Sequence, residues 1–283
     1  MGSIRQALVR SLPRHRQDDF DTHLFGLARD PLSSSDVISA DTDVGSLLLH
    51  ANDLVMTPAI SETGCWEADE GAWMRAVLAP GNTALDIGAN IGYFTVLMSH
   101  QVGETGRVIA VEPEQRNLRL LSYNLWRNCC DNVRVVPAAA WHSRTTLVLR
   151  HNAANAGDHQ VHPSKTSADD VLVPAVALDD IVSETVVHAI KIDTQGADHE
   201  VLAGLEGTLR RNPHAPVLTE FWPDNLIERN VSPTNVLAQY RTLNRPIGLL
   251  KSGAAVTIAT DEEILAAAQA AEGHWVNVVL GAR

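Results

Sequence analysis

From about residue 71 onward, short apolar runs alternate with segments in which apolar residues recur at helical spacing. The runs rich in β-branched residues predict strands at 83–88, 106–113, 132–141, 145–152, 188–196, 216–222 and 274–282, and a strand followed by a short helix within 171–182. Helical spacing predicts helices at 71–79, 94–102, 115–128, 197–211 and 261–273. Strands that alternate with helices in this way indicate βαβ units and a doubly wound, mostly parallel sheet.

The first 70 residues differ from this pattern. They hold scattered short elements, a polar break at 30–36 and one candidate strand at 44–52. The start of the chain is basic and amphipathic, and it lacks the continuous apolar core of a secretory signal. We interpret residues 1–70 as a small N-terminal cap and residues 71–283 as a single domain.

Composition narrows the class of protein further. Hydrophobic residues make up 45% of the 283 positions, enough to bury the core of one large α/β domain. No apolar run approaches the roughly 18 residues that a membrane helix needs. Cys65, Cys129 and Cys130 form no disulfide framework, which predicts a reducing, cytoplasmic location. The net charge of −12 argues against binding to nucleic acid or an anionic membrane and favours a small-molecule partner, with no prediction for the oligomeric state.

The stretch LDIGANIGYFT is the first candidate site. A predicted strand ends in Asp86, and Gly88 and Gly92 follow before a helix begins. Dinucleotide-binding loops carry a middle glycine where this chain has Ala89 and Asn90, and no Walker sequence follows. The loop therefore suits a ligand that needs close backbone approach but carries no pyrophosphate.

Two acids complete this candidate site. Asp86 could accept a hydrogen bond from a charged amine. Glu112 ends the next strand, where a carboxylate can accept from both hydroxyls of a ribose. An amine and a ribose without a pyrophosphate are combined in S-adenosylmethionine.

Five motifs in order extend this pattern over residues 64–222, and the last strand adds a weaker one. They are DIGANIGYFT, VIAVEPEQRNLRLLSYNL, VVPAAAW, IKIDTQGADHEVLAGL and VLTEF. Together they resemble the FkbM family of S-adenosylmethionine-dependent methyltransferases. The resemblance implies the Rossmann-like class I methyltransferase fold, a seven-stranded, mostly parallel sheet with an antiparallel last strand. It also implies O-methylation of a hydroxyl group on a small natural product or sugar.

The resemblance also implies a set of cofactor-binding residues: Glu67, Asp86, Gly88, Ala89, Asn90, Gly92, Tyr93, Phe94, Glu112, Pro113, Asn117 and Ala139. One position departs from the family pattern. The family usually has D-x-E-G in its fourth motif, whereas this chain has an amide, Gln195, in place of the glutamate. A hydrogen-bonding role survives this change, and a role that needs negative charge does not.

Transfer of a methyl group to a hydroxyl is helped by a base or by a metal that lowers the hydroxyl pKa. Asp193 and Glu220 end neighbouring predicted strands, so they are candidates for base and orienting group, or for Mg²⁺ ligands. His159 is a further candidate base, and Asp158 could bind a metal together with Asp193. The alternatives are that Asp193 caps the following helix and that His159 belongs to a solvated loop.

Tryptophans near the motif ends, Trp66, Trp141 and Trp222, could line an acceptor pocket, although most tryptophans belong to the core. Two other functions compete with methyl transfer. A nicotinamide-dependent oxidoreductase would share the sheet, but the glycine pattern argues against it. A non-catalytic S-adenosylmethionine-binding protein stays open because of Gln195 and because fold alone does not define function.

Overall fold

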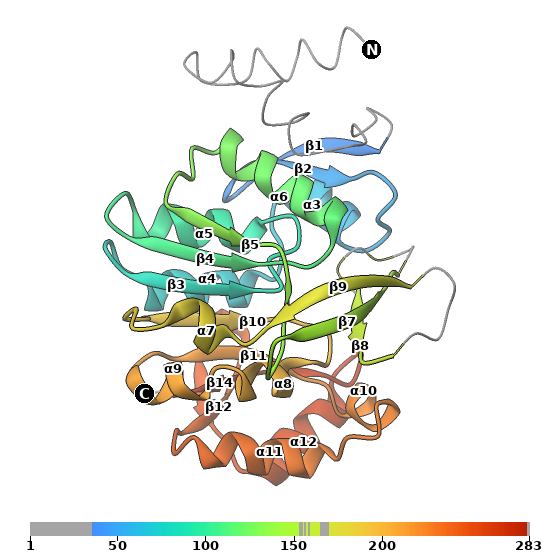
Figure 1. Ribbon diagram of the computed structural model, residues 1–283, viewed down its shortest axis with the longest axis vertical. Helices are drawn as coiled ribbons and strands as arrows, with labels where there is room; N and C mark the ends of the chain where they lie inside the picture. The colour runs from blue at the N-terminus through green and yellow to red at the C-terminus, as the bar shows by residue number, and fades with distance from the viewer. Residues whose placement is uncertain (1–35, 153–154, 156, 158, 165–169, 282–283) are drawn as a thin grey trace, which may run out of the picture.

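The computed structural model describes residues 36–152, 155, 157, 159–164 and 170–281, which are arranged around a central sheet (Figure 1). In spatial order its strands are β13 (Val256–Ile258), β12 (Ile247–Leu250), β14 (Val276–Leu280), β11 (Val217–Phe221), β10 (Ala189–Ile192), β3 (Thr83–Ile87), β4 (Arg107–Val111) and β5 (Val133–Val136). The five strands from β11 to β5 are parallel, and β14 pairs antiparallel with β11 and with β12. The class I methyltransferase fold is thus confirmed. The sheet has eight strands instead of seven because the three residues of β13 pair with β12 at its edge.

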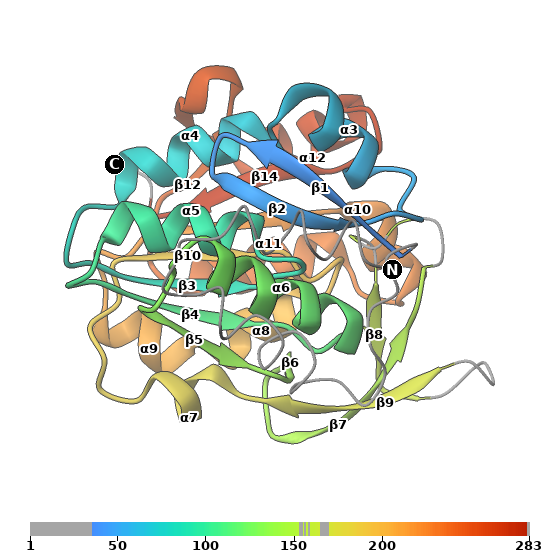
Figure 2. The same ribbon diagram turned by 90° about the horizontal axis from the view of Figure 1, so that it is seen from above.

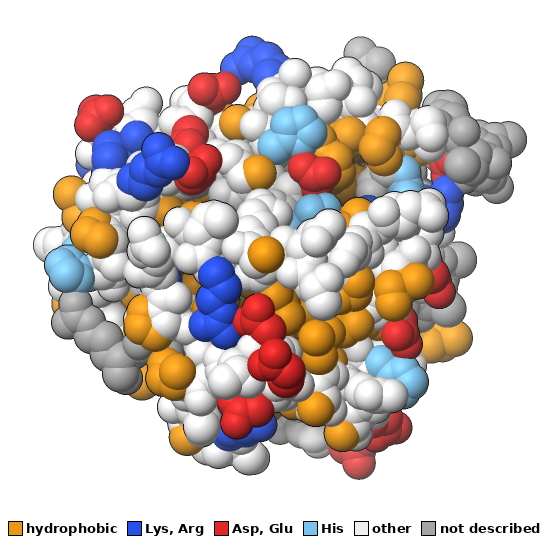
Figure 3. All heavy atoms as spheres, turned by 90° about the horizontal axis from the view of Figure 1, so that it is seen from below, with side chains coloured by type: hydrophobic (Ala, Val, Ile, Leu, Met, Phe, Trp, Pro, Cys, Tyr) orange, Lys and Arg blue, Asp and Glu red, His pale blue; other side chains and the backbone are white. Residues whose placement is uncertain are grey.

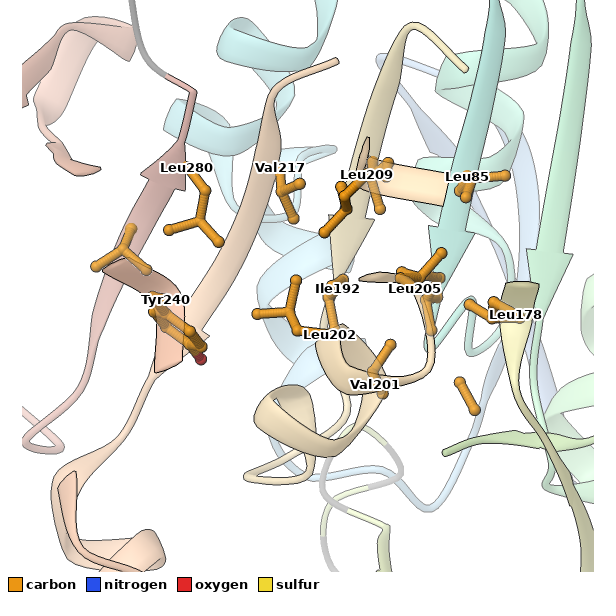
Figure 4. Packing of buried hydrophobic residues seen from close by; sticks show 14 of the residues in the cluster. Leu85, Leu178, Ile192, Val201, Leu202, Leu205, Leu209, Val217, Tyr240 and Leu280 are labelled. Atoms are coloured by element: carbon orange, nitrogen blue, oxygen red, sulfur yellow. The ribbon is translucent and has the colours of Figure 1, made fainter. Parts of the chain in front are cut away.

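Helices cover both faces of this sheet (Figures 1 and 2). The first face packs against α4 (Ala68–Val77), α5 (Tyr93–Val102) and α6 (Gln115–Arg127). The second face packs against α7 (Leu178–Val182), α8 (Asp198–Ala203), α9 (Glu206–Arg211), α10 (Pro223–Glu228), α11 (Pro233–Thr242) and α12 (Asp261–Ala270), and Figure 4 shows part of this core. Among the described residues, no helix is long and apolar enough to cross a bilayer.

The period of two along each strand decides which side chains meet. In β3, Ala84 joins the first core, whereas Leu85 and Ile87 join the second. The side chain of Asp86 therefore lies on the face of α4 and α5. Lys191 of β10 is directly opposite Asp86 in the parallel register, so it shares that face.

A hairpin lies beside α6 on the first face (Figure 2). It consists of β1 (Val37–Thr42) and β2 (Gly45–His50) and is followed by α3 (Met56–Thr63). The Asn124 side chain of α6 accepts the Leu48 N–H at 2.7 Å and donates to the carbonyls of Leu48 and Ile91 at 3.0 and 2.8 Å. The hairpin is thereby tied to the loop after β3. A domain division at residue 70 stays a prediction, and that boundary falls inside α4.

A second, smaller sheet follows β5, in the order β6 (Ala139–Ala140), β9 (Val171–Val176), β7 (Thr145–Arg150) and β8 (Gln160–His162). The sequence predicted one strand over 132–141, but Pro137 has no N–H to pair and separates β5 from β6. The predicted polar loop at 155–170 contains β8, which pairs with β7.

The predicted helix at 197–211 is two helices, α8 and α9. They meet at Gly204, where a Cβ atom would lie 2.1 Å from the carbonyl oxygen of Trp141. The chain between β11 and α12, for which the sequence analysis predicted no elements, forms α10, α11, β12, a 3₁₀ turn η2 (Ser252–Ala254) and β13.

Candidate functional site

A cavity of about 300 Å³ lies at the carboxyl ends of β3, β4, β10 and β11, where parallel α/β sheets bind their ligands. Of the predicted site residues, those that line it are Glu67, Asp86, Gly88, Ala89, Asn90, Tyr93, Phe94, Glu112, Pro113, Asn117, Ala139, His159, Asp193 and Glu220. Gly92 does not line it, and Asp158 lies outside the described residues. The cavity therefore brings together side chains from segments far apart in the sequence.

The loop Asp86–Gly92, here called the cofactor loop, owes its shape to its glycines. Gly88 has φ +87°, and a Cβ atom there would lie 1.8 Å from the carbonyl oxygen of Asp193. Only glycine allows the ends of β3 and β10 to approach so closely. Gly92 has φ +94° and packs on Leu121 of α6, so the structure gives it a role in helix packing and places it away from the cavity.

Glu112 is held at the end of β4 by hydrogen bonds to both carboxylate oxygens. Oε2 accepts the N–H of Asn90 at 2.9 Å, and Oε1 accepts the N–H of Glu114 at 2.8 Å and the side chain of Asn117 at 3.5 Å. Burial raises the pKa of Glu112 to about 7, although these hydrogen bonds oppose the rise. The carboxylate is thereby oriented against the cofactor loop.

Asp86 lies deeper at the same end of the sheet, where 1% of the residue is exposed. Its Oδ2 accepts the hydroxyl of Thr95 at 2.5 Å. Burial raises the pKa of Asp86 to about 6, while Lys191 and Thr95 act in the opposite direction. Asp86 therefore binds a proton more tightly than an exposed aspartate does.

Three carboxylates, Glu67, Glu70 and Asp193, lie around one buried lysine. A fourth, Glu220, offers an oxygen within 4.8 Å of Glu67 and Asp193, and we call the four the carboxylate cluster. The Lys191 ammonium lies 2.8 Å from Asp193, 3.5 Å from Glu70 and 3.7 Å from Glu67. Lys191 and Asp193 are two residues apart along the end of β10 and so share a face, and Glu220 is the penultimate residue of the adjacent strand β11. Glu67 and Glu70 come from the start of α4.

The cluster has four carboxyl groups beside one lysine, and this excess of acids shifts some of their pKa values. Burial and the nearby carboxylates raise the pKa of Glu220 well above its usual range. Burial and the Glu70 carboxylate do the same to Glu67. Burial alone would lower the pKa of Lys191, but Asp193 and the other acids outweigh it, so Lys191 stays charged.

Asp193 directs its carboxylate into this cluster. Its Oδ2 accepts from Lys191, and its Oδ1 accepts the Gln195 side-chain N–H at 2.6 Å. This contact explains the departure at Gln195, because an ionised glutamate would have no proton to donate there. The alternative that Asp193 caps a helix is wrong, since α8 begins at Asp198 with Ala197 as its cap residue and has no side-chain cap.

His159 lines the cavity in a fixed orientation. Its Nδ1 accepts the backbone N–H of Asn152 at 3.1 Å, and its ring contacts that of His151 edge-on. A neutral imidazole that accepts at Nδ1 carries its proton on Nε2. In this arrangement His159 is a hydrogen-bond donor through Nε2, and the lone pair that a base needs is already engaged.

Three carboxylates of the cluster, Glu67, Asp193 and Glu220, each place one oxygen within 4.8 Å of the others. Such oxygens are the ligands that Mg²⁺ prefers. The Lys191 ammonium, however, already lies against Asp193 and near Glu67. A divalent ion held by the same oxygens would face a positive charge at short range, so the residues present do not fit a metal here.

Lys191, Glu70 and Trp275 are among the residues of the site that the sequence did not lead us to predict. Lys191 could have been predicted from the sequence, because a lysine is unusual inside an apolar run such as AIKI. It precedes Asp193 by two residues, so the two side chains must lie on the same face of the sheet. Of the tryptophans considered from sequence, Trp66 and Trp222 line the cavity. Trp141 is buried in the core of the small sheet.

The doubly wound sheet, the cofactor loop and the acid at the end of β4 define the class I methyltransferase fold. Comparison with family profiles agrees, since the methyltransferase FkbM domain matches residues 86–234, more than half of the chain. The chain therefore belongs to the FkbM family of methyltransferases. No curated protein sequence matches it.

Solved structures of methyltransferases resemble it at low identity. A methyltransferase FkbM from Methylobacillus flagellatus KT is 16% identical with a TM-score of 0.45, over 74% of this chain and 50% of that one. A SAM-dependent methyltransferase from Aquifex aeolicus is 16% identical with a TM-score of 0.42, over 75% and 88%. Fibrillarin from Aeropyrum pernix, with natively bound S-adenosyl-L-methionine, is 10% identical with a TM-score of 0.41, over 90% and 85%. The chain thus spans half the length of the Methylobacillus protein.

Proposed function

We propose that this protein transfers the methyl group of S-adenosylmethionine to a hydroxyl oxygen of a small molecule, a sugar or another natural product. One observation carries the proposal: the cofactor loop, Glu112, Asp193 and Glu220 all line one cavity at the carboxyl end of the sheet. A methyl donor and a hydroxyl acceptor could therefore meet there, which is the positioning that methyl transfer requires.

The cofactor end of the cavity suits the nucleoside of the donor. Glu112 has both oxygens oriented by hydrogen bonds to Asn90, Glu114 and Asn117, and it accepts the two ribose hydroxyls in our proposal. Ala89 and Asn90 stand where a dinucleotide loop has the middle glycine that approaches the pyrophosphate, which supports S-adenosylmethionine over a dinucleotide.

At the acceptor end, Glu220 is the better base. Burial and the nearby carboxylates raise the pKa of Glu220, so its ionised carboxylate is a stronger base than that of an exposed glutamate. Asp193 is paired with Lys191 and orients the acceptor hydroxyl through a hydrogen bond. As the oxygen–carbon bond forms and the carbon–sulfur bond breaks, the hydroxyl proton passes to Glu220, leaving a methyl ether and S-adenosylhomocysteine. In our proposal His159, which carries its proton on Nε2, serves as a hydrogen-bond donor to the acceptor molecule.

The lining favours a small polyhydroxylated acceptor. Trp66, Trp222 and Trp275 offer flat apolar surfaces beside the carboxylate cluster, and apolar faces of sugar or aromatic rings pack well on such surfaces. On the face in Figure 3, the Lys and Arg side chains of the described residues are scattered among acidic ones and form no continuous basic surface. Together with the net charge of −12, this supports a small molecule over a nucleic acid.

The test is transfer of an isotope-labelled methyl group from S-adenosylmethionine to a panel of sugars and hydroxylated natural products. We expect a labelled methyl ether, and we expect Glu220→Gln to lower kcat by about a hundredfold or more while S-adenosylhomocysteine still binds. Glu228→Gln, at an exposed position of α10, is the matched control and should behave as wild type. Methylation at nitrogen or carbon, or an unchanged rate in Glu220→Gln, would contradict this account.

A further inference from the structure

We propose that Lys191 is the resident cation of the acceptor site. It takes the place that a divalent metal would occupy among the carboxylates, so methyl transfer needs no metal. The inference rests on the proposed function, since it assigns a positioning residue to that reaction, but its decisive test needs neither cofactor nor acceptor.

The contacts of the ammonium carry the argument. Lys191 Nζ lies 2.8 Å from Asp193 Oδ2, 3.5 Å from Glu70 Oε2 and 3.7 Å from Glu67 Oε2. It also lies 4.4 Å from the centre of the Phe94 ring, within the range of a cation–π contact. The ammonium is thus surrounded by the oxygen atoms that a hard metal ion would select.

Lys191 cannot leave this place easily. Its backbone is held in the middle of the sheet, opposite Asp86 of β3 and Leu218 of β11, and its side chain is 3% exposed. A buried charge persists only where partners compensate its lost hydration, and here the carboxylate cluster provides them. The lysine and the cluster are therefore one electrostatic unit.

This unit positions Asp193. Lys191 holds one carboxylate oxygen and Gln195 holds the other, so the plane of the carboxylate is fixed before an acceptor arrives. Lys191 thereby acts on the acceptor through Asp193, as a positioning residue.

Removal of the lysine side chain should convert the unit into a metal site. Lys191→Ala would leave Glu67, Glu70 and Asp193 without their cation. Glu67, Asp193 and Glu220 already offer oxygens within 4.8 Å of one another. Because such a set binds hard divalent ions, we expect Lys191→Ala to bind Mn²⁺ at least about tenfold more tightly than wild type.

The experiment is a titration of the full chain with Mn²⁺, followed by electron paramagnetic resonance, without cofactor. Wild type, Lys191→Arg and the exposed-lysine control Lys251→Ala should bind Mn²⁺ only weakly, and Lys191→Ala should gain a site that Lys191→Ala/Glu220→Gln loses. Circular dichroism confirms that each variant is folded.

Two results would overturn the inference. One is a folded Lys191→Ala variant that binds Mn²⁺ no better than wild type. The other is a Mn²⁺ site in the wild-type protein that Glu220→Gln removes. This comparison of wild type with Glu220→Gln tests the inference even if Lys191→Ala does not fold. Methyl transfer by wild type should also be unchanged by EDTA. Failure of S-adenosylhomocysteine to bind would instead contradict the proposed function and leave the Mn²⁺ result to stand on its own.

Discussion

The closest backbone approach in the cofactor loop gives a quantitative prediction for Gly88→Ala. A Cβ atom at Gly88 would lie 1.8 Å from the carbonyl oxygen of Asp193, whereas ordinary contact begins near 3.4 Å. The ends of β3 and β10 would therefore have to separate by about 1.6 Å. The obstacle is a main-chain oxygen, so no side-chain rotation relieves it.

Two effects add up at this position. An alanine at positive φ costs about 1–2 kcal/mol of conformational energy. Overpacking against an immobile neighbour adds about 1–3 kcal/mol. Gly253→Ala isolates the first effect, because Gly253 has φ +76° and a Cβ atom there would meet nothing within 4 Å. We expect Gly88→Ala to lower the free energy of unfolding by about 2–5 kcal/mol and Gly253→Ala by about 1–2 kcal/mol.

The assay is urea unfolding of both variants, together with titration of S-adenosylhomocysteine. Gly88→Ala should also weaken binding by about tenfold or more, because the loop moves relative to Asp193. Gly253→Ala should bind as wild type does. Equal destabilisation of the two variants, or unchanged affinity in Gly88→Ala, would refute the reasoning about this contact.

Three further predictions follow from single side chains. Asn124→Ala removes hydrogen bonds to Leu48 and Ile91 and should lower the free energy of unfolding by about 2–4 kcal/mol in urea, whereas a loss under 1 kcal/mol would show that the hairpin is not held this way. The pKa of Glu112 rises on folding from 4.5 to about 7, so the folded state binds the proton more tightly and stability falls as pH increases across that window. In thermal unfolding measured from pH 4.5 to 7.5, Glu112→Gln should lose less stability with rising pH than wild type does. An equal loss in both proteins would show that Glu112 does not cause the pH dependence. Asp193→Asn should slow methyl transfer while calorimetry still detects cofactor binding, and a wild-type rate would remove Asp193 from the reaction.

Local signals in the sequence predicted the centre of the fold. The run from Thr83 to Val111 follows strand, glycine turn, helix and strand in the predicted order, because its apolar residues and glycines leave few other conformations. The short strands at the edges of the two sheets could not be predicted from local sequence. β8 lies in a polar segment and exists only because it pairs with β7, and β13 has three residues that pair with β12. Pairing partners of this kind lie outside any local window.

The residues of the site likewise divide into those that local sequence predicts and those that depend on contacts between distant segments. Predicted positions such as Glu112 and Asp193 line the cavity, since strand ends of a parallel sheet converge at one edge. Lys191 and Glu70 were missed because their role depends on which charges meet across β10 and α4. His159 lines the cavity, but its backbone hydrogen bond, which decides between the roles of donor and base, is visible only in three dimensions.

The measurement that tests the central claim most directly is calorimetric titration of the protein with S-adenosylhomocysteine, with NAD as the comparison. We predict that S-adenosylhomocysteine alone binds, and that Glu112→Ala abolishes binding while the protein stays folded. Binding of NAD alone, or an unchanged affinity in Glu112→Ala, would contradict the assignment of this cavity to S-adenosylmethionine.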